Sequence, residues 1–286
     1  MGTSKPKSKK EALSELINNL VDTLHSKGNS GLIEPNEFLL RKTLNLAEPF
    51  MDADPANYWH LKGLIEANRC NFKQADINFK NAIKLDKSRI QIQMNYLNIL
   101  LALGKTEEVG SWITDNFVPK DVNYYCLSHL FTLGLLNLDF TTFNKYYAAA
   151  SHDSILPAAL VEQIKTIPNI ERMKTYLDEL NVSKVDFKAV MRFILIFFSE
   201  KTLEVFSPHF SMEQDADSLE INLYLNIDVK TAVKLTNEFE SKFVQFALEE
   251  GKPDYLSHFA VFFRPSSLLE ETPSLNEEDN LCEEVH

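Results

Sequence analysis

The sequence predicts an α-rich chain in two parts, an N-terminal solenoid of helical hairpins followed by a small α+β domain. The first part is predicted from a pattern of apolar and small residues that recurs with a period of roughly 34 residues over 56–157. The second part is predicted from a change of period after about residue 182. There, residues 218–228 alternate between apolar and mostly polar side chains, which is typical of a half-buried strand.

Composition excludes several classes of protein. The chain has 286 residues, of which 44% are hydrophobic, and its 20 Phe and 9 Tyr can fill a substantial core. A net charge of −12 disfavours binding to nucleic acid and to an anionic membrane surface. The longest apolar run, "FILIFF" at 193–198, is far shorter than the roughly 20 residues of a membrane span. We therefore expect no membrane partner and no nucleic-acid partner.

The cysteines and the N-terminus bear on the compartment. Cys70, Cys126 and Cys282 have no metal-ligand spacing, and three scattered cysteines fit a reducing environment better than a disulfide framework. Residues 1–8 are rich in lysine and lack the apolar core of a secretory signal, so we expect a flexible basic tail. These features predict a cytoplasmic protein.

The first predicted elements precede the repeats. Residues 9–26 are expected to form one helix and residues 35–55 another, separated by the Gly-containing segment "SKGNSG". The second helix carries an apolar stripe at helical spacing, formed by Leu39, Leu40, Leu44, Ala47 and Phe50. Together these helices are expected to form an irregular first hairpin.

Three hairpins follow, at 56–89, 90–123 and 124–157. The second helix of the first hairpin places four residues on one face, and the corresponding positions of the other two hairpins are mostly apolar or small as well. The three sets are Phe72, Ala75, Phe79 and Ala82; Thr106, Val109, Ile113 and Asn116; and Phe140, Phe143, Tyr147 and Ala150. The intervening turns, "CNF", "GKT" and "LDF", also align. Shorter capping helices are expected in "LPAALVEQIKTI" and "NIERMKTYLDEL", so that the array spans 9–181.

The unit at 56–89 resembles a tetratricopeptide repeat (TPR). The residues that carry the resemblance are Trp59, Gly63, Ala75, Phe79 and Ala82. Two positions depart from the family pattern, because Lys62 stands where Leu is usual and Lys87 where Pro is usual. The other two units resemble the family mainly in phase. Ordinary helical hairpins at a coincidental spacing are the alternative.

The resemblance implies a concave groove lined by the first helix of each hairpin. By phase, the groove residues are Asn57, His60, Leu64, Ala67, Asn68, Gln91, Met94, Asn98, Leu101, Tyr125, Ser128, Thr132, Leu135 and Leu136. This lining of amide, hydroxyl and apolar groups lacks the Lys/Arg pattern with which family members clamp a C-terminal carboxylate. We expect it to bind a peptide or helix segment of another protein. Packing between helices is the alternative for each of these side chains.

The second half, 182–265, resembles no family that we recognise. Residues 185–200 are expected to form a buried helix, 203–210 an edge strand, 218–228 a strand and 255–263 another strand. Between the last two, Asp228 is expected to cap a helix that ends at Gly251. The apolar stripe expected on this helix comprises Val229, Val233, Phe239, Phe243 and Phe246. This order suggests a short antiparallel sheet with helices on one face.

Two features of this half predict association. The segment 255–263 has apolar side chains on both faces, and helices on one side of a small sheet can cover only one of them. We therefore expect the α+β domain to form a homodimer or to dock a second partner. Residues 266–286 carry seven carboxylates and no Lys or Arg, which predicts a disordered acidic tail.

No catalytic, cofactor-binding or metal-binding motif was found. "LGKT" at 103–106 lacks the earlier glycine of a phosphate loop and is interpreted as a turn between helices. His209 and His258 lie on neighbouring predicted strands and are the best enzyme or metal candidates, although ordinary packing is the preferred reading. We therefore expect an adaptor or chaperone-like protein that is not an enzyme and has no cofactor. The alternative is an enzyme or regulatory factor whose active or effector domain is 182–265.

Overall fold

The computed structural model describes residues 8–27, 36–150, 161, 164–165, 167–201, 210–215, 218–225, 227–265 and 267. Most of these residues are helical, and a small sheet lies near the C-terminus, as the sequence predicts in coarse terms. The chain divides into two compact units, Met1–Pro208 and His209–His286, which are described separately below.

The N-terminal unit begins with α1 (Lys9–Lys27) and α2 (Glu37–Ala47), followed by the short 3₁₀ helix η2 (Glu48–Phe50). At the start of α1, the Ser8 backbone N–H donates to Glu11 Oε2 at 2.7 Å and the Glu11 N–H donates to Ser8 Oγ at 3.2 Å, which is a capping box. The buried side chains of α1 and α2 form one cluster with α3, whose core members are Leu13, Ile17, Leu20, Leu40, Ala47, Tyr58, Leu61 and Ile65. Both predicted helices therefore form and pack together, and residues 28–35 between them lie outside the described residues.

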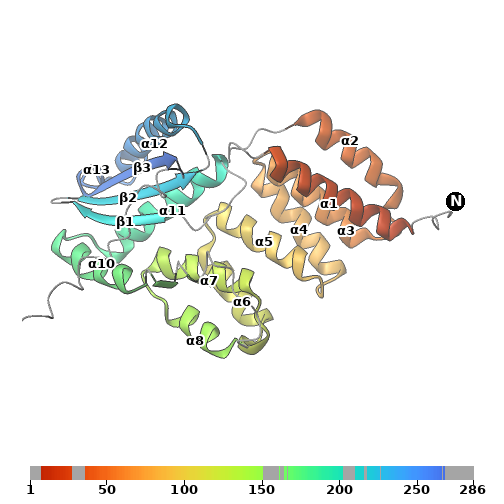
Figure 1. The fold of residues 1–286 in the computed structure, drawn as a ribbon, viewed down its shortest axis with the longest axis horizontal. Coiled ribbons are helices and arrows are strands. Elements are labelled where there is room, and N and C mark those ends of the chain that lie inside the picture. The colour runs from red at the N-terminus through yellow and green to blue at the C-terminus, as the bar shows by residue number, and fades with distance from the viewer. Residues whose placement is uncertain are drawn as a thin grey trace, which may run out of the picture. The chain divides into compact units, whose positions relative to one another are not determined.

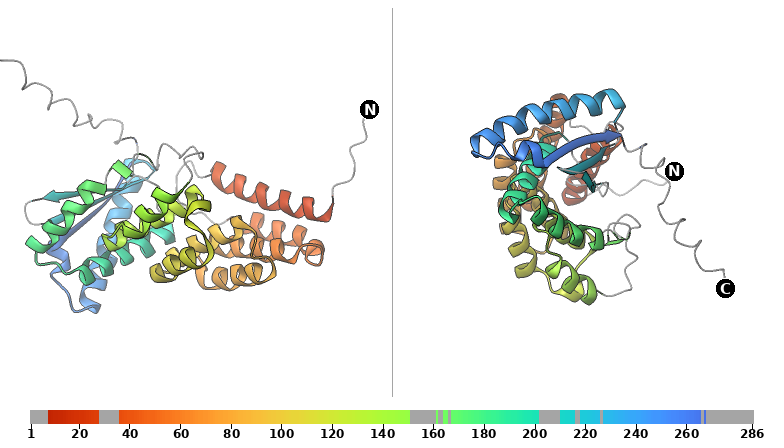
Figure 2. Two further views of the ribbon diagram at one scale, coloured as in Figure 1. Left: turned by 90° about the horizontal axis from the view of Figure 1, so that it is seen from below. Right: turned by 90° about the vertical axis from the view of Figure 1, so that its left-hand side faces the viewer.

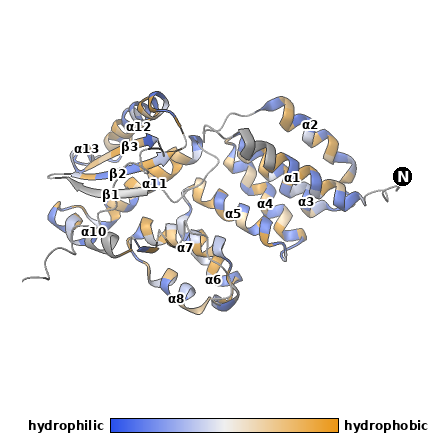
Figure 3. Cartoon of the chain, viewed as in Figure 1, coloured by the Kyte–Doolittle hydropathy of each residue, from blue (hydrophilic) through white to orange (hydrophobic). Residues whose placement is uncertain are grey.

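Six helices follow in sequence, and consecutive members pack against one another (Figure 1). They are α3 (Pro55–Asn68), α4 (Phe72–Leu85), α5 (Ile90–Ala102), α6 (Thr106–Asn116), α7 (Tyr124–Asn137) and α8 (Thr141–Ala149). The 3₁₀ helix η3 (Pro119–Asp121) stands between α6 and α7. Hydrophobic and hydrophilic residues alternate along these helices in Figure 3, as expected for helices with one buried face.

The turns after α3, α5 and α7 have the same backbone conformation at equivalent positions of the three hairpins. Cys70, Gly104 and Leu138 have φ of 56°, 66° and 49°, the left-handed region. In each turn the N–H of the residue that follows donates to the carbonyl oxygen five residues before it. The pairs are Asn71 to Glu66, Lys105 to Leu100 and Asp139 to Gly134. This pair of features is the Schellman motif, which satisfies carbonyl groups at a helix end. The backbone thus repeats where the sequence aligns "CNF", "GKT" and "LDF".

The interiors of the hairpins explain most of the repeated residues. Ala75, Phe79 and Ala82 are completely buried. A Cβ atom on Gly63 would lie 2.8–2.9 Å from three ring atoms of Phe79, so α3 and α4 approach closely only because residue 63 has no side chain. Trp59 differs from its expected role, because it is only half-buried and lies under the Lys62 ammonium, 4.6 Å from its ring centroid.

Two further helices complete the described part of the N-terminal unit. Helix α10 (Ile167–Glu179) matches the predicted capping helix in "NIERMKTYLDEL", whereas most of "LPAALVEQIKTI" lies outside the described residues. Helix α11 (Lys184–Lys201) is buried along one face, as predicted, through Phe187, Val190, Met191, Ile194, Leu195, Phe197 and Phe198. It packs against α5 and α7 and belongs to the N-terminal unit. The division between the units therefore falls later in the chain than the boundary that we predicted at 182.

The C-terminal unit contains β1 (Phe210–Asp215), β2 (Ser218–Leu225), α12 (Val229–Glu249), α13 (Tyr255–His258) and β3 (Phe259–Pro265). The strand order is β1-β2-β3; β1 pairs with β2 antiparallel, and β2 pairs with β3 parallel. The prediction of an antiparallel sheet is therefore wrong for β2 and β3. Helix α12 is a crossover that returns the chain to the same end of the sheet, and parallel pairing follows. The predicted edge strand at 203–210 lies outside the described residues except for Phe210.

One face of this sheet packs against α12 (Figure 2). The predicted apolar face of β2 is confirmed, with Leu219, Ile221, Leu223 and Leu225 buried, whereas Asn222 on the predicted polar face is buried as well. Asp228 caps α12 as predicted, accepting from the Thr231 N–H at 2.7 Å.

The predicted apolar stripe of α12 is only partly right. Phe239 and Phe243 are buried and Phe246 is half-buried, whereas Val229 and Val233 are exposed.

The other sheet face is more polar than predicted. Residues 255–258 form α13 rather than the start of a strand, so Leu256 is not on the sheet. Phe262 is half-buried beneath the Arg264 guanidinium, 5.2 Å from the ring centroid. Arg264 also donates to Glu220 Oε1 at 2.7 Å and to Asn222 Oδ1. An uncovered apolar face was expected here, and part of it is instead an ion pair stacked on an aromatic ring.

Candidate interaction surface on the first helices

The first helices of the three hairpins, α3, α5 and α7, are neighbours in the N-terminal unit, and we call the side that they present the first-helix surface. Three predicted groove residues, Asn57, Gln91 and Tyr125, occupy equivalent positions near the starts of these helices. Asn57 is half-buried, whereas Gln91 and Tyr125 are exposed. The accessible part of the surface is therefore centred on the N-terminal halves of α5 and α7.

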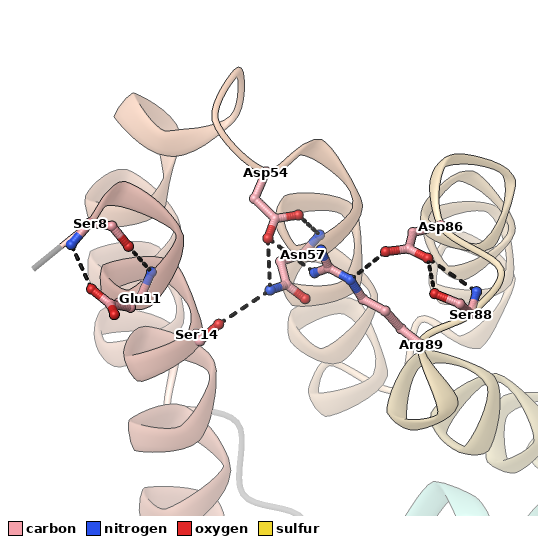
Figure 4. A network of polar contacts seen from close by, with 8 residues as sticks. All are labelled: Ser8, Glu11, Ser14, Asp54, Asn57, Asp86, Ser88 and Arg89. Carbon is pink, nitrogen blue, oxygen red and sulfur yellow. Dashed lines mark hydrogen bonds and ion pairs between the residues drawn. The ribbon is translucent and has the colours of Figure 1, made fainter.

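Polar side chains fix where α3 and α5 begin (Figure 4). Asp54 is 5% exposed and caps α3 by accepting from the Asn57 backbone N–H at 3.2 Å. Arg89, which precedes α5, donates to Asp54 at 3.1 Å and to Asp86 at 2.7 Å. Hydrogen bonds from Ser88 and Arg89 lower the pKa of Asp86. The Arg89 guanidinium, at the start of the second hairpin, is thus bonded to both ends of the first hairpin.

The α1 helix borders the surface on the side of α3. The Asn57 side-chain amide donates to Ser14 Oγ of α1 at 3.4 Å and to Asp54 Oδ2 at 3.2 Å (Figure 4). Asn57 was predicted to offer its amide to a partner. In the structure that amide already joins α3 to α1, so Asn57 contributes less to an open surface than Gln91 and Tyr125 do.

Two buried histidines join the first helices to one another. His60 Nε2 of α3 lies 2.9 Å from Asn95 Nδ2 of α5, so the imidazole accepts a hydrogen bond from the amide. Burial lowers the pKa of His60 to about 4, and the nearby Arg89 contributes to the same shift. His60 is therefore neutral at pH 7, and its role is to hold α3 against α5.

His129 makes the equivalent connection between α7 and α5. Its Nδ1 lies 2.6 Å from the Tyr125 carbonyl oxygen, so Nδ1–H donates to that oxygen. Burial lowers the pKa of His129, although this backbone hydrogen bond opposes the shift. The ring Nε2 lies 2.8 Å from the atom placed as Asn98 Oδ1. A neutral ring that donates at Nδ1 accepts at Nε2. The Asn98 amide nitrogen must then face the ring, with its oxygen directed away.

A tyrosine pair stands at the start of α7. The rings of Tyr124 and Tyr125 are 3.8 Å apart between centroids, and the two side chains are 37% and 50% exposed. Desolvation, together with the hydrogen bond to Tyr125, raises the pKa of Tyr124 to about 12, so Tyr124 is protonated at neutral pH. The pair is an accessible aromatic platform with hydroxyl groups at its edge, a combination common at protein interfaces. Sequence analysis identified Tyr125 and missed Tyr124; the doublet at a helix start was the available signal.

Seven of the predicted groove residues are buried, and the prediction that they line an open groove is wrong. They are His60, Asn68, Met94, Leu101, Thr132, Leu135 and Leu136. Asn68 and Thr132 bond within their own helices, to Leu64 O at 2.9 Å and Ser128 O at 3.0 Å, whereas Met94 contacts Cys126 at 3.7 Å between sulfur atoms. Leu64, Asn98 and Ser128 are half-buried. For the buried residues, packing between helices, the alternative reading, is correct.

The C-terminal ends of α5 and α7 are contacted by α11. Leu135 and Leu136 of α7 are buried, and a cleft of about 190 Å³ lies between Leu136, the start of α6 and α11. Lys188 of α11 closes one side of this cleft with an ion pair to Glu107 of α6 at 2.8 Å. The predicted groove is thus shortened by a helix of the same chain, and its accessible part lies toward the helix N-termini.

Other predicted candidates for chemistry gain no support from the geometry. "LGKT" forms the turn at Gly104 between α5 and α6, as interpreted from sequence. His258 ends α13, and His209 lies outside the described residues, so their expected meeting on neighbouring strands is not observed. Among the described residues, no three His, Cys, Asp or Glu side chains are grouped as metal ligands. Within the same ranges, no helix is both long enough and apolar enough to cross a bilayer.

Comparison with known proteins finds no significant match to the chain, whether among family models, curated proteins or solved structures.

Proposed function

We propose that this protein is an interaction protein that binds a peptide or helix segment of another protein through the first-helix surface. The observation that carries this proposal is the uncharged row on α5 and α7 formed by Gln91, Tyr124, Tyr125 and Ser128. An exposed aromatic pair near an exposed amide and a hydroxyl group suits a ligand that offers backbone hydrogen-bonding groups and an apolar side chain.

The wider proposal is that residues 9–181 form a TPR-like helical array. The recurrence of one turn conformation at Cys70, Gly104 and Leu138 supports it. So does the close contact of Gly63 with Phe79, which is the contact expected where two helices of a hairpin cross. In such an array each hairpin buries its faces against its neighbours, and the first helices are left to present a continuous surface. An adaptor or chaperone-like role follows from that arrangement.

The proposed ligand is neutral where it meets the surface. Gln91 and Ser128 can donate and accept hydrogen bonds, as an extended backbone requires. Tyr124 and Tyr125 provide ring surface for a proline, an aromatic or an aliphatic side chain. The nearest charged network, Asp54–Arg89–Asp86, is already paired within the protein.

Site-specific photo-crosslinking in cells tests this proposal. A photoreactive amino acid is placed at Tyr125 in one variant and at Ile77 in another. Ile77 is 51% exposed on α4, a second helix, and serves as the matched control. We expect position 125 to crosslink one protein repeatedly, within one short segment of that protein, and position 77 not to crosslink it. Equal crosslinking of the same protein from both positions would contradict a specific first-helix surface.

A further inference from the structure

Helix α12 presents an apolar stripe that no described residue of the C-terminal unit covers. Four of its aliphatic side chains are exposed: Val229 at 64%, Val233 at 52%, Val244 at 42% and Leu248 at 64%. At 3.6 residues per turn these positions fall within a sector of about 100° on one side of the helix, away from the face that carries Phe239 and Phe243 against the sheet. The stripe is therefore separate from the core of the C-terminal unit.

The stripe is symmetric about the middle of the helix. Val229 and Leu248 are equally distant from the midpoint between residues 238 and 239, and so are Val233 and Val244. Asn237 and Glu240, which are exposed within the same sector between the two apolar pairs, are also equidistant from it. A two-fold axis through this midpoint, perpendicular to the helix, would bring the stripe onto itself.

We propose that a second copy of this chain covers the stripe, through antiparallel packing of the two α12 helices. Val229 of one copy then meets Leu248 of the other, and Val233 meets Val244. The symmetry of the stripe favours a second copy over an unrelated partner, because an isologous interface must be complementary to itself. This inference does not depend on the proposed function of the first-helix surface.

Charge along α12 fits the same arrangement. The exposed polar residues beside the stripe include Lys230 and Lys234 in the first half of the helix and Ser241, Lys242, Gln245 and Glu249 in the second. Antiparallel packing places Lys230 nearest the end of the other helix that carries Glu249, and Lys234 nearest Gln245. It also sets each helix N-terminus beside the other's C-terminus, which the helix dipoles favour.

The polar centre fixes the register. Antiparallel packing sets Asn237 opposite Glu240 of the other copy, so that the Asn237 amide can donate to the Glu240 carboxylate on both sides of the axis. A shift by one helical turn would place Asn237 against Val244 in one direction, or Glu240 against Val233 in the other, and would separate Asn237 from Glu240. Four aliphatic side chains per copy form a smaller contact than the roughly 800 Å² per partner of a standard interface. The dimer is therefore expected to be weak and concentration-dependent.

Sedimentation of the full chain is the first test. Over about 1–200 μM, wild type is expected to shift from monomer to dimer, and Val233→Lys with Val244→Lys is expected to raise the midpoint concentration at least about tenfold. The control is Val185→Lys on α11, another exposed valine, which should leave the midpoint unchanged. Wild type that stays monomeric, or a midpoint that the double substitution leaves unmoved, overturns the proposal.

Disulfide formation tests the antiparallel register. Two variants are made in a Cys282→Ser background, one with Val233→Cys and one with Val244→Cys. The two positions lie about 16 Å apart along α12 at about 1.5 Å per residue, so antiparallel copies do not bring position 233 near its own equivalent. We expect a mixed disulfide between the two variants when they are combined, and little dimer from either alone. Rapid linkage of Val233→Cys to itself would contradict the antiparallel arrangement.

Discussion

At the scale of single residues, the buried polar groups decide how the first helices are held. His60 and His129 both lie on first helices, and each is used inside the protein to bond a neighbouring first helix. His60 was predicted from phase as a groove residue. The position of a residue in the 34-residue repeat cannot tell whether its side chain lines a groove or bonds a neighbouring helix. The side of a helix that faces a groove is continuous with the side that faces the next helix. The partner amides of Asn95 and Asn98 could not be assigned from sequence for the same reason.

The lowered pKa of His60 predicts a loss of stability in mild acid. Its pKa is about 4 in the folded protein and near 6.5 when unfolded, so between these values the unfolded chain binds a proton that the folded chain does not. Stability from this group is complete above pH 6.5 and falls toward pH 4, by up to about 1.4 kcal/mol per pH unit. Urea unfolding at pH 7.5, 6.5 and 5.5 measures this slope. His60→Gln keeps an acceptor for Asn95 and should show a shallower slope; an equal slope would show that other groups control the acid response.

Gly63 and Gly110 form a matched pair of substitutions. A Cβ atom at residue 63 would meet the buried Phe79 ring at 2.8 Å, whereas one at residue 110 would lie an ordinary 3.6 Å from Leu133. Gly63→Ala should therefore destabilise the protein by about 1–3 kcal/mol through overpacking. Gly110→Ala should stabilise it by up to about 1 kcal/mol, because Ala has the higher helix propensity. Denaturant midpoints distinguish the two, and a stabilising Gly63→Ala would show that α3 and α4 are not closely apposed.

At the scale of helices and strands, the sequence predicts elements with one local period and fails where the long-range arrangement decides. The apolar face of 218–225 and the cap at Asp228 depend on neighbouring residues, and both are confirmed, although Asn222 on the predicted polar face is buried too. The parallel pairing of β2 with β3 depends on how α12 crosses the sheet, which no local pattern encodes. Helix α11 was recognised as buried, but its attachment to α5 and α7 could be learned only from the packed structure.

Burial distinguishes two aromatic residues that the family resemblance treats alike. The family resemblance gives Trp59 a packed position, yet Trp59 is half-buried in the structure, and Phe79 is completely buried. Phe79→Ala should therefore cost roughly 3–5 kcal/mol, and Trp59→Ala clearly less. Urea denaturation monitored by circular dichroism compares the two variants under one condition. A larger loss of stability for Trp59→Ala than for Phe79→Ala would contradict this ranking and would favour the packed role that the family resemblance implies for Trp59.

At the scale of the whole molecule, the chain combines two proposed contact surfaces on separate compact units. The first-helix surface belongs to the N-terminal unit and is proposed to bind a segment of another protein. The α12 stripe belongs to the C-terminal unit and is proposed to pair with a second copy. A dimer would carry two first-helix surfaces, so a partner with two binding segments would be held more tightly than a partner with one.

Salt dependence at the first-helix surface follows from its uncharged side chains. Gln91, Ser128 and the tyrosine pair contribute hydrogen bonds and apolar contact, and ionic screening weakens neither strongly. The affinity of a peptide bound there should change by less than about threefold between about 50 and 300 mM NaCl. Fluorescence anisotropy with a labelled peptide measures this. A fall of tenfold or more would show that charged residues elsewhere carry the binding.

The most direct test of the central claim is calorimetric titration of the segment that crosslinks to position 125, made as a synthetic peptide. Wild type, Gln91→Ala with Tyr125→Ala, and the control Ile77→Ala are compared after far-ultraviolet circular dichroism has shown equal helix content. We predict that the double substitution weakens binding at least about tenfold, while Ile77→Ala binds like wild type. Unchanged binding by the double variant, or an equal loss with Ile77→Ala, would contradict the assignment of the first-helix surface.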